Sequence, residues 1–157
     1  MWFMKALSQT IQTAVSLLTP YAQTVDYPAT NRADMVVAVA DLVTAVSTLH
    51  ESNWGYLAAI TGLDCGLESS ELEVLYHFCA GAAVVTMRVK VGKETAVVPS
   101  ICPTIPSASF FERELSEMLG ITVASTPNTA RLFLPDNWPA GVYPLRKDFQ
   151  PEMINGN

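Results

Sequence analysis

The sequence predicts an α+β domain: a small mixed or antiparallel sheet covered by an amphipathic helix, followed by an extended, proline-rich C-terminal tail. Three observations support this. Apolar residues recur at helical spacing over 35–49, apolar and polar residues alternate over much of 72–91, and eight of the ten prolines lie between Pro99 and Pro151. We expect one domain over 1–157, made of an N-terminal helical segment (1–24), a helix-plus-sheet core (25–98) and a docking helix with its tail (99–157).

Two helices are predicted in the first third of the chain. Over 4–18, apolar residues gather on one side and the pattern stops before Pro20. Over 35–49, Met35, Val39, Leu42, Val46 and Leu49 recur at spacings of four and three. Asn31 is placed to cap this second helix and Asp34 falls in its first turn. We expect its apolar stripe to cover one face of the sheet.

The sheet itself is predicted from the next forty residues. An apolar strand is expected over 56–63, and apolar and polar residues alternate over 72–78 and 84–91. The short connections favour antiparallel hairpins. A turn after Val91 leads to an expected edge strand over 95–98 that ends at Pro99. Because proline removes a backbone donor, we expect regular sheet pairing to stop there.

A short helix is predicted over 109–119. Ser109 and Glu112 have the spacing of a capping box, and Gly120 suits the left-handed position after a helix. Glu112 and Glu114 point about 200° apart on such a helix, so they cannot share a proton as a catalytic pair. Arg113 and Glu117, four residues apart, are expected to form a modest surface ion pair.

Composition excludes several functions. The net charge of −6 repels nucleic-acid phosphates, and no apolar run reaches the roughly 18 residues that a membrane span requires. Only 15% of residues are charged, below the roughly 25% typical of soluble domains, so we expect partners to cover part of the surface. Three widely spaced cysteines and two histidines predict free thiols and no metal or cofactor in this chain.

The tail combines aromatic and charged residues. Trp138, Tyr143 and Phe149 lie in the same segment as Arg131 and Arg146, a composition enriched at protein interfaces. Aromatic residues bury large areas in either setting, so composition leaves two alternatives open. The tail either wraps its own domain or docks on a partner.

Four motifs then identify a family resemblance. They are Ser-Ala-Ser-Phe-Phe-Glu-Arg-Glu at 107–114, Met-Leu-Gly-Ile at 118–121, Arg-Leu-Phe-Leu-Pro-Asp-Asn-Trp at 131–138 and Tyr-Pro-Leu-Arg-Lys-Asp-Phe at 143–149. Over roughly residues 25–150 the chain resembles the thirty-kilodalton subunit family of respiratory complex I. That family includes the matching subunits of membrane-bound, energy-converting nickel-iron hydrogenases and of formate hydrogenlyase.

The resemblance implies a non-catalytic structural subunit in the peripheral arm of a membrane-bound complex, on the cytoplasmic side. Its expected partners are the catalytic large subunit, a small iron-sulfur subunit and other peripheral-arm subunits, with the nickel-iron centre and iron-sulfur clusters held by those partners. The subunit would support electron transfer coupled to ion translocation. The residues expected to dock are Glu112, Arg113, Glu114, Arg131, Asp136, Trp138, Arg146, Lys147 and Asp148.

The branch of the family is a separate question. Residues 125–129 read Ser-Thr-Pro-Asn-Thr where complex I members usually carry Gly-His-Pro, which favours the hydrogenase branch. The alternative is the equivalent subunit of an NADH- or ferredoxin-quinone oxidoreductase. Because the sequence ends soon after Phe149, we expect the large subunit to be a separate chain. A stand-alone hydrolase using Glu112 or His77 is disfavoured because no base with an orienting partner is visible.

Overall fold

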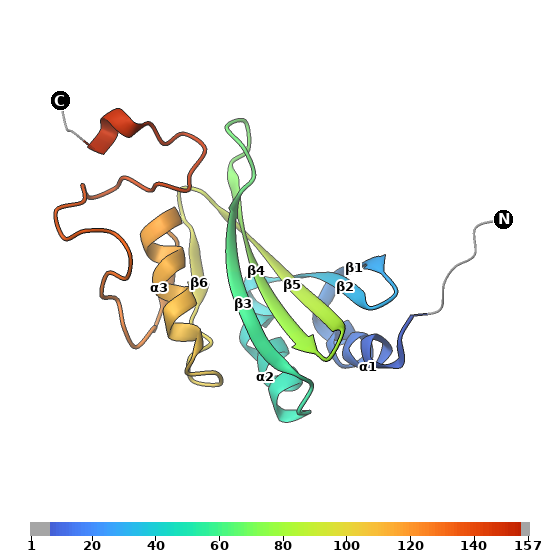
Figure 1. Ribbon diagram of the computed structural model, residues 1–157. Helices are drawn as coiled ribbons and strands as arrows, with labels where there is room; N and C mark the ends of the chain where they lie inside the picture. Colours follow the sequence, from blue (N-terminus) through green and yellow to red (C-terminus); the bar gives the residue numbers. More distant parts are fainter. Residues whose placement is uncertain (1–6, 155–157) are drawn as a thin grey trace.

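A computed structural model describes residues 7–154 and contains a five-stranded mixed sheet in the order β1-β2-β5-β4-β3 (Figure 1). The strands are β1 (Ala22–Ala29), β2 (Arg32–Val37), β3 (Tyr56–Asp64), β4 (Glu71–Ala80) and β5 (Ala83–Gly92). β2 pairs with β5 in parallel, and the other neighbours pair antiparallel. The predicted α+β class and the hairpin of β4 and β5 are confirmed.

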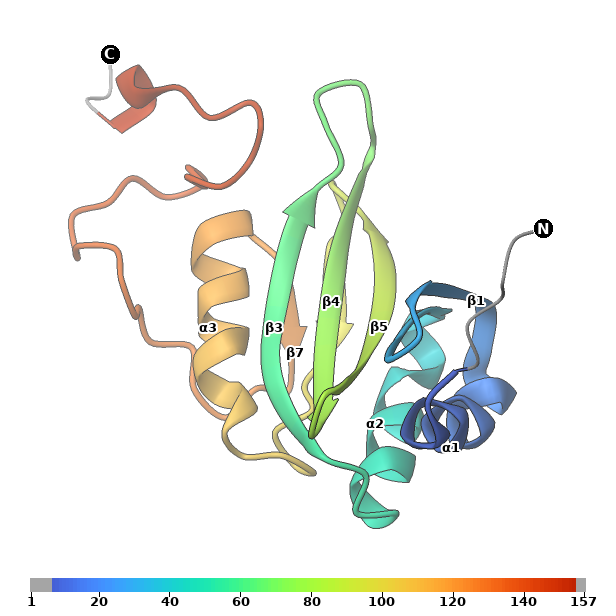
Figure 2. The same ribbon diagram turned by 45° about the vertical axis from the view of Figure 1, so that its right-hand side comes forward.

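One face of the sheet carries the main core. The helices α1 (Gln9–Leu18) and α2 (Leu42–Glu51) contribute Ile11, Leu18 and Leu49, all fully buried. They share this core with sheet residues such as Met35 and Met87. Two single 3-10 turns, η1 (Thr19–Tyr21) and η2 (Val39–Asp41), precede β1 and α2. In Figure 2, no helix of the described chain crosses in front of β3 and β4, so the opposite face is open.

The predicted helix over 35–49 is wrong in its first half. Residues 32–37 form β2, in which Ala33, Met35 and Val37 are buried and their neighbours are less so, a period of two. The α-helix begins only at Leu42, as α2. The alternation was masked because Met35, Val39 and Leu42 also fit a helical spacing, and pairing with β5 decided the outcome. Strand β1 was not predicted at all.

Two smaller expectations for this region are also wrong. Asn31 does not cap a helix, and its side-chain amide donates to the carbonyl of Ala82 at 2.6 Å. Asp34 lies in β2, with its carboxylate 3.7 Å from the Arg88 guanidinium. The predicted first helix is confirmed over α1, while residues 4–6 lie outside the described part.

A second layer follows the main sheet. Helix α3 (Ala108–Leu119) packs along β3, and a two-stranded parallel sheet joins β6 (Val97–Pro99) to β7 (Thr122–Ala124). Pairing therefore continues past Pro99, contrary to the prediction, and β6 is not an edge of the main sheet. Gly120 ends α3 with a φ of 68°, as predicted. The capping box is wrong: Ser107 precedes the helix without a side-chain cap bond, and Glu112 points inward.

Residues 125–154, which we call the strap, complete the chain. They contain no helix or strand over 125–150 and close with the 3-10 helix η3 (Pro151–Ile154). Backbone hydrogen bonds such as Trp138 N to Pro135 O and Phe149 N to Arg146 O turn the strap back on itself. The strap is rich in proline, but a single extended form is not confirmed.

The contact of α3 with β3 generates a stability prediction. A side chain at Gly62 would place its Cβ 2.1 Å from Leu119 Cδ1 and 2.9 Å from Leu115 Cδ2. We expect Gly62→Val to lower the free energy of unfolding by about 1–3 kcal/mol through overpacking, measured by urea denaturation. Gly92→Val is the matched control, because a Cβ there meets only Thr95 Oγ1 at 3.5 Å. Equal effects at both positions would contradict this packing.

Candidate docking surface

Helix α3 is held to the preceding loop by a buried carboxylate. Glu112 is 2% exposed and accepts hydrogen bonds from Ser100 Oγ (2.9 and 3.0 Å), Ile101 N (2.8 Å) and Cys102 Sγ (3.1 Å). Burial, with the Glu112 carboxylate beside it, raises the pKa of the Cys102 thiol, which keeps it protonated as a donor. Glu112 was expected to dock on a partner. Its carboxylate is instead engaged inside this chain's own fold.

A second carboxylate on α3 organises the strap. Glu117 accepts from three consecutive backbone amides, those of Leu132 (3.2 and 3.3 Å), Phe133 (2.8 Å) and Leu134 (2.8 Å). Burial acts to raise the pKa of Glu117, but these three donors outweigh it and hold the pKa below its usual value. The carboxylate therefore fixes the loop around Phe133 to the helix.

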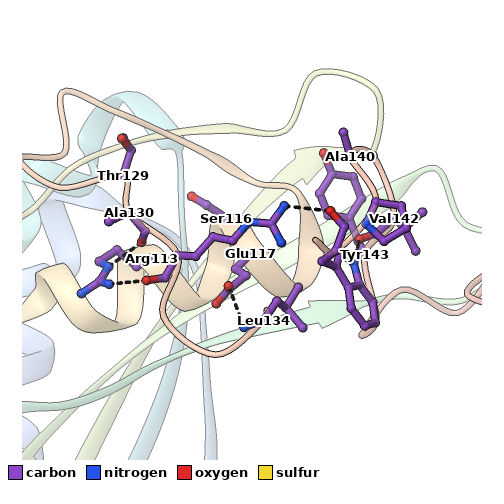
Figure 3. A pocket seen from close by; sticks show the side chains of 13 residues that line it. Arg113, Ser116, Glu117, Thr129, Ala130, Leu134, Ala140, Val142 and Tyr143 are labelled. Atoms are coloured by element: carbon purple, nitrogen blue, oxygen red, sulfur yellow. Dashed lines mark hydrogen bonds between the residues drawn. The ribbon is translucent and has the colours of Figure 1, made fainter. Parts of the chain in front are cut away.

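The expected ion pair of Arg113 with Glu117 is absent from the salt bridges among residues 7–154. Arg113 instead donates from Nε to the carbonyl of Ala130 at 2.7 Å and from Nη2 to that of Arg131 at 2.6 Å. Figure 3 shows Arg113 and Glu117 both reaching from α3 to the strap. The strap offers carbonyls to the arginine and amides to the glutamate, so each residue bonds backbone rather than the other.

Arg131 and Trp138 close the next turn. The Arg131 guanidinium donates to the carbonyls of Pro135 (2.6 Å) and Trp138 (3.0 Å), and Trp138 Nε1 donates to Val142 O at 2.8 Å. The Trp138 ring stacks on Phe149 with 6.3 Å between centroids. A cavity of about 210 Å³ remains between this turn and α3 (Figure 3). Two predicted docking residues thus hold the shape of the strap.

A third carboxylate joins the strap to the main sheet. Asp64, 4% exposed at the end of β3, accepts from Lys93 Nζ (2.8 Å), Gly66 N (2.9 Å) and Lys147 N (3.0 Å). Burial would raise the pKa of Asp64, but these donors, first the Lys93 ammonium, lower it to about 2. Lys147 thus contributes its backbone amide, which sequence patterns cannot reveal.

Arg146 makes its contacts within the chain. It donates from Nε to Leu119 O at 2.8 Å and from Nη2 to Lys93 O at 3.4 Å, and it lies 4.9 Å from the Tyr143 ring centroid. Its expected docking on a partner stays a prediction. Asp136, Lys147 and Asp148 are exposed, and Glu114 is half-buried.

The structure adds exposed apolar side chains that the residue-type argument did not select. Phe133 is 62% exposed at the loop held by Glu117, Leu145 is 54% exposed, and Phe110 is 61% exposed. Phe133 and Leu145 lie inside the motifs quoted above, but only the folded strap distinguishes them from buried neighbours. Their exposure creates an apolar surface along α3 and the strap.

The ring nitrogens of His77 contact two threonine hydroxyls, and the cysteines of the described chain are free thiols. The half-buried His77 has its Nδ1 3.1 Å from Thr86 Oγ1 and its Nε2 3.2 Å from Thr61 Oγ1. Burial lowers the pKa of His77. Cys65 and Cys102 are free, with pKa values raised chiefly by burial. Within 7–154, His, Cys, Asp and Glu side chains form no cluster of three suited to a metal ion, and no helix has the length and apolar character to cross a membrane.

Carboxylates and arginines thus fix the strap to an α+β core, and apolar side chains on the strap and on α3 lie exposed. The chain belongs to the respiratory-chain NADH dehydrogenase 30 kDa subunit family, whose model matches residues 35–154. The expected family is thereby confirmed.

Relatives come from both branches of that family. The chain is 33% identical to formate hydrogenlyase subunit 5 of Escherichia coli over 73% of its own length, but it spans 21% of that relative. It is 30% identical to an NADH-quinone oxidoreductase subunit of Moorella thermoacetica, covering 84% of this chain and 86% of the relative. Identity to the corresponding NADH-quinone oxidoreductase subunit of Maricaulis maris reaches 42% over 59% of this chain and 46% of the relative.

Solved structures share the fold. A chain of the membrane-bound sulfane sulfur reductase, an archaeal respiratory membrane complex, superimposes with a TM-score of 0.76 at 21% identity, covering 90% of this chain and 84% of that one. The trypsin-resistant fragment of Nqo5 gives a TM-score of 0.59 at 20% identity, covering 76% of this chain and 96% of that one. Both similarities show a shared fold.

Asp64 generates a pH prediction. Its folded pKa of about 2 lies below the ordinary 3.8, so its stabilisation is complete above about pH 4 and disappears as the pH falls through 2. We expect Asp64→Asn to cost about 2 kcal/mol of unfolding free energy at pH 7 and clearly less at pH 2.5, measured by urea denaturation. Asp136→Asn, at an exposed carboxylate, is the control. A pH-independent difference would contradict the assignment.

Glu117 generates a prediction about the strap alone. Glu117→Gln removes the charge that orients three backbone amides, so we expect chymotrypsin to cut after Phe133 about fivefold faster through local opening. Mass spectrometry of the fragments measures this rate. Glu114→Gln on the same helix should leave the rate unchanged, and equal acceleration by both variants would argue against the Glu117 anchor.

Proposed function

We propose that the chain is a non-catalytic docking subunit in the peripheral arm of a membrane-bound nickel-iron hydrogenase complex, at the cytoplasmic side of the membrane. Its main partner would be the hydrogenase-type large subunit, with a small iron-sulfur subunit nearby. The nickel-iron centre and the clusters would belong to those partners. Electron transfer coupled to ion translocation would then be a property of the assembly. This chain would hold its partner subunits in position.

The observation that carries the proposal is the way the strap presents Phe133. Three amides bound to Glu117 and two carbonyls bound to Arg113 hold this loop against α3, while the Phe133 ring remains 62% exposed. An apolar ring held outward loses little conformational freedom when a partner covers it, which favours tight binding. The hydrogen bonds of Glu117 and Arg113 therefore preorganise the strap as a binding surface.

The choice of branch rests on a narrower observation. The Ser-Thr-Pro-Asn-Thr run replaces the Gly-His-Pro element, and two relatives of the hydrogenase type, formate hydrogenlyase subunit 5 and hydrogenase-4 component G, match over 73% of the chain. The second candidate is the equivalent subunit of an NADH- or ferredoxin-quinone oxidoreductase. It is favoured by the 42% identity to the Maricaulis maris relative and by the length agreement with the Moorella thermoacetica relative.

The docking surface is tested by truncating Phe133. We expect Phe133→Ala to weaken binding to the large subunit about 30-fold, the loss typical of a buried aromatic anchor, measured as co-purified large subunit at graded salt and dilution. Val43→Ala is the control, because Val43 is an exposed apolar residue on α2, away from the strap. Unchanged yield for Phe133→Ala would reject the strap as the docking surface.

The same purification decides the branch. Mass spectrometry of the bound large subunit should show two Cys-x-x-Cys pairs that ligate nickel in the hydrogenase type and that the quinone type has lost. A bound large subunit without these pairs would overturn the hydrogenase assignment and leave the docking role intact.

A further inference from the structure

Strand β3 forms one edge of the five-stranded sheet, and its outward backbone groups are unpaired. Cys65 N donates to Glu71 O, which sets the alternation of the antiparallel ladder between β3 and β4. By that alternation, Ile60 and Gly62 direct their N–H and C=O groups away from β4. Among the residues described, no other backbone group bonds them.

This edge carries fewer of the devices that usually protect a strand from pairing with another chain than the opposite edge does. The other edge, β1, carries Asp26 and Pro28 and has two irregularities in its pairing. β3 has one irregularity, between Leu57 and Ala59, and from Ala59 to Leu63 it has neither a charged residue nor a proline. The strap hydrogen-bonds to the end of β3 at Asp64, through the amide of Lys147. The stretch 59–63 thus has no charge, proline or irregularity on its own edge.

A groove of about 210 Å³ runs beside the open edge. It is lined by Ile60 and Gly62 of β3, by Phe111, Glu114 and Met118 of α3, and by Leu145 of the strap. Side chains of a strand paired to Ile60 and Gly62 would point into this groove, because paired residues share a face. The groove is mostly apolar, with Thr61 and Glu114 as its polar lining residues, so it favours apolar side chains.

Glu114 supplies the charge that identifies the occupant. It is half-buried in the groove wall and makes no salt bridge with any residue in 7–154. A basic side chain on the added strand would neutralise it. A second copy of β3 cannot do so, because that strand contains no lysine or arginine and ends in Asp64.

We propose that the β3 edge binds an extended apolar segment of a different protein, added as a sixth strand, with one lysine or arginine directed at Glu114. Backbone hydrogen bonds would give the affinity, and the groove would give the specificity. This contact shares Leu145 with the apolar surface of the strap but does not include Phe133, and it does not depend on which complex contains the chain.

The probe is the end-blocked peptide Thr-Val-Thr-Lys-Thr-Val-Thr, whose binding to the full chain is measured by fluorescence anisotropy. Two matched peptides replace the lysine with glutamate or carry N-methyl groups on the three groove-facing residues. We expect the lysine peptide to bind about tenfold more tightly than either, and to protect the Ile60 and Gly62 amides from hydrogen exchange. Failure of the lysine peptide to bind, or equal binding of all three, would overturn the proposal.

A charge swap makes the test specific. Glu114→Lys should reverse the preference and bind the glutamate peptide more tightly, whereas Glu51→Lys, at the exposed end of α2, should leave the preference unchanged. An unaltered preference in Glu114→Lys would reject the role of Glu114. If Phe133→Ala loses large-subunit binding and the peptide does not bind, the proposed function is retained and the added strand is rejected. If the peptide binds and Phe133→Ala keeps its large-subunit binding, the added strand is retained and the strap is rejected as the docking surface.

Discussion

The buried Glu112 carboxylate is the interaction on which the C-terminal half of the molecule depends. Its hydrogen bonds to Ser100, Ile101 and Cys102 fix α3 against the loop that follows β6. A buried carboxylate is costly unless its acceptor capacity is used, and here donors from three residues use it. With α3 fixed, Leu115 and Leu119 lie on Gly62, and Glu117 faces the strap.

Backbone groups, more than side-chain pairs, attach the strap. Glu117 and Asp64 bind its amides, and Arg113 and Arg146 reach carbonyls in or beside it. A chain segment without helix or strand has many backbone groups to satisfy, and charged side chains satisfy them strongly. The charged motifs therefore have a structural role first, and that role is what leaves Phe133 and Leu145 exposed. The alternatives of self-wrapping and docking are compatible, because the strap wraps its own domain through polar contacts and presents apolar ones outward.

Much of the fold could be predicted from the chain alone. The alternation over 72–78 and 84–91 has one interpretation, and β4 and β5 follow it. The residues around Met35 allow two interpretations, because their spacing fits both a strand and a helix. Only the parallel pairing with β5 distinguishes the strand from the helix. Strand β7 has three residues and is defined entirely by its partner β6, so no local pattern could have identified it.

The sequence by itself determined the fold class and the family, because periodicity, composition and contiguous motifs are local properties. Tertiary structure alone decided what each charged residue does. Glu112 entered the core, Arg113 and Glu117 turned to backbone rather than to each other, and Lys147 bonded through its amide. The reason is physical: a charged side chain bonds whichever donor or acceptor the fold brings within about 3 Å, and residues distant in sequence supply those groups.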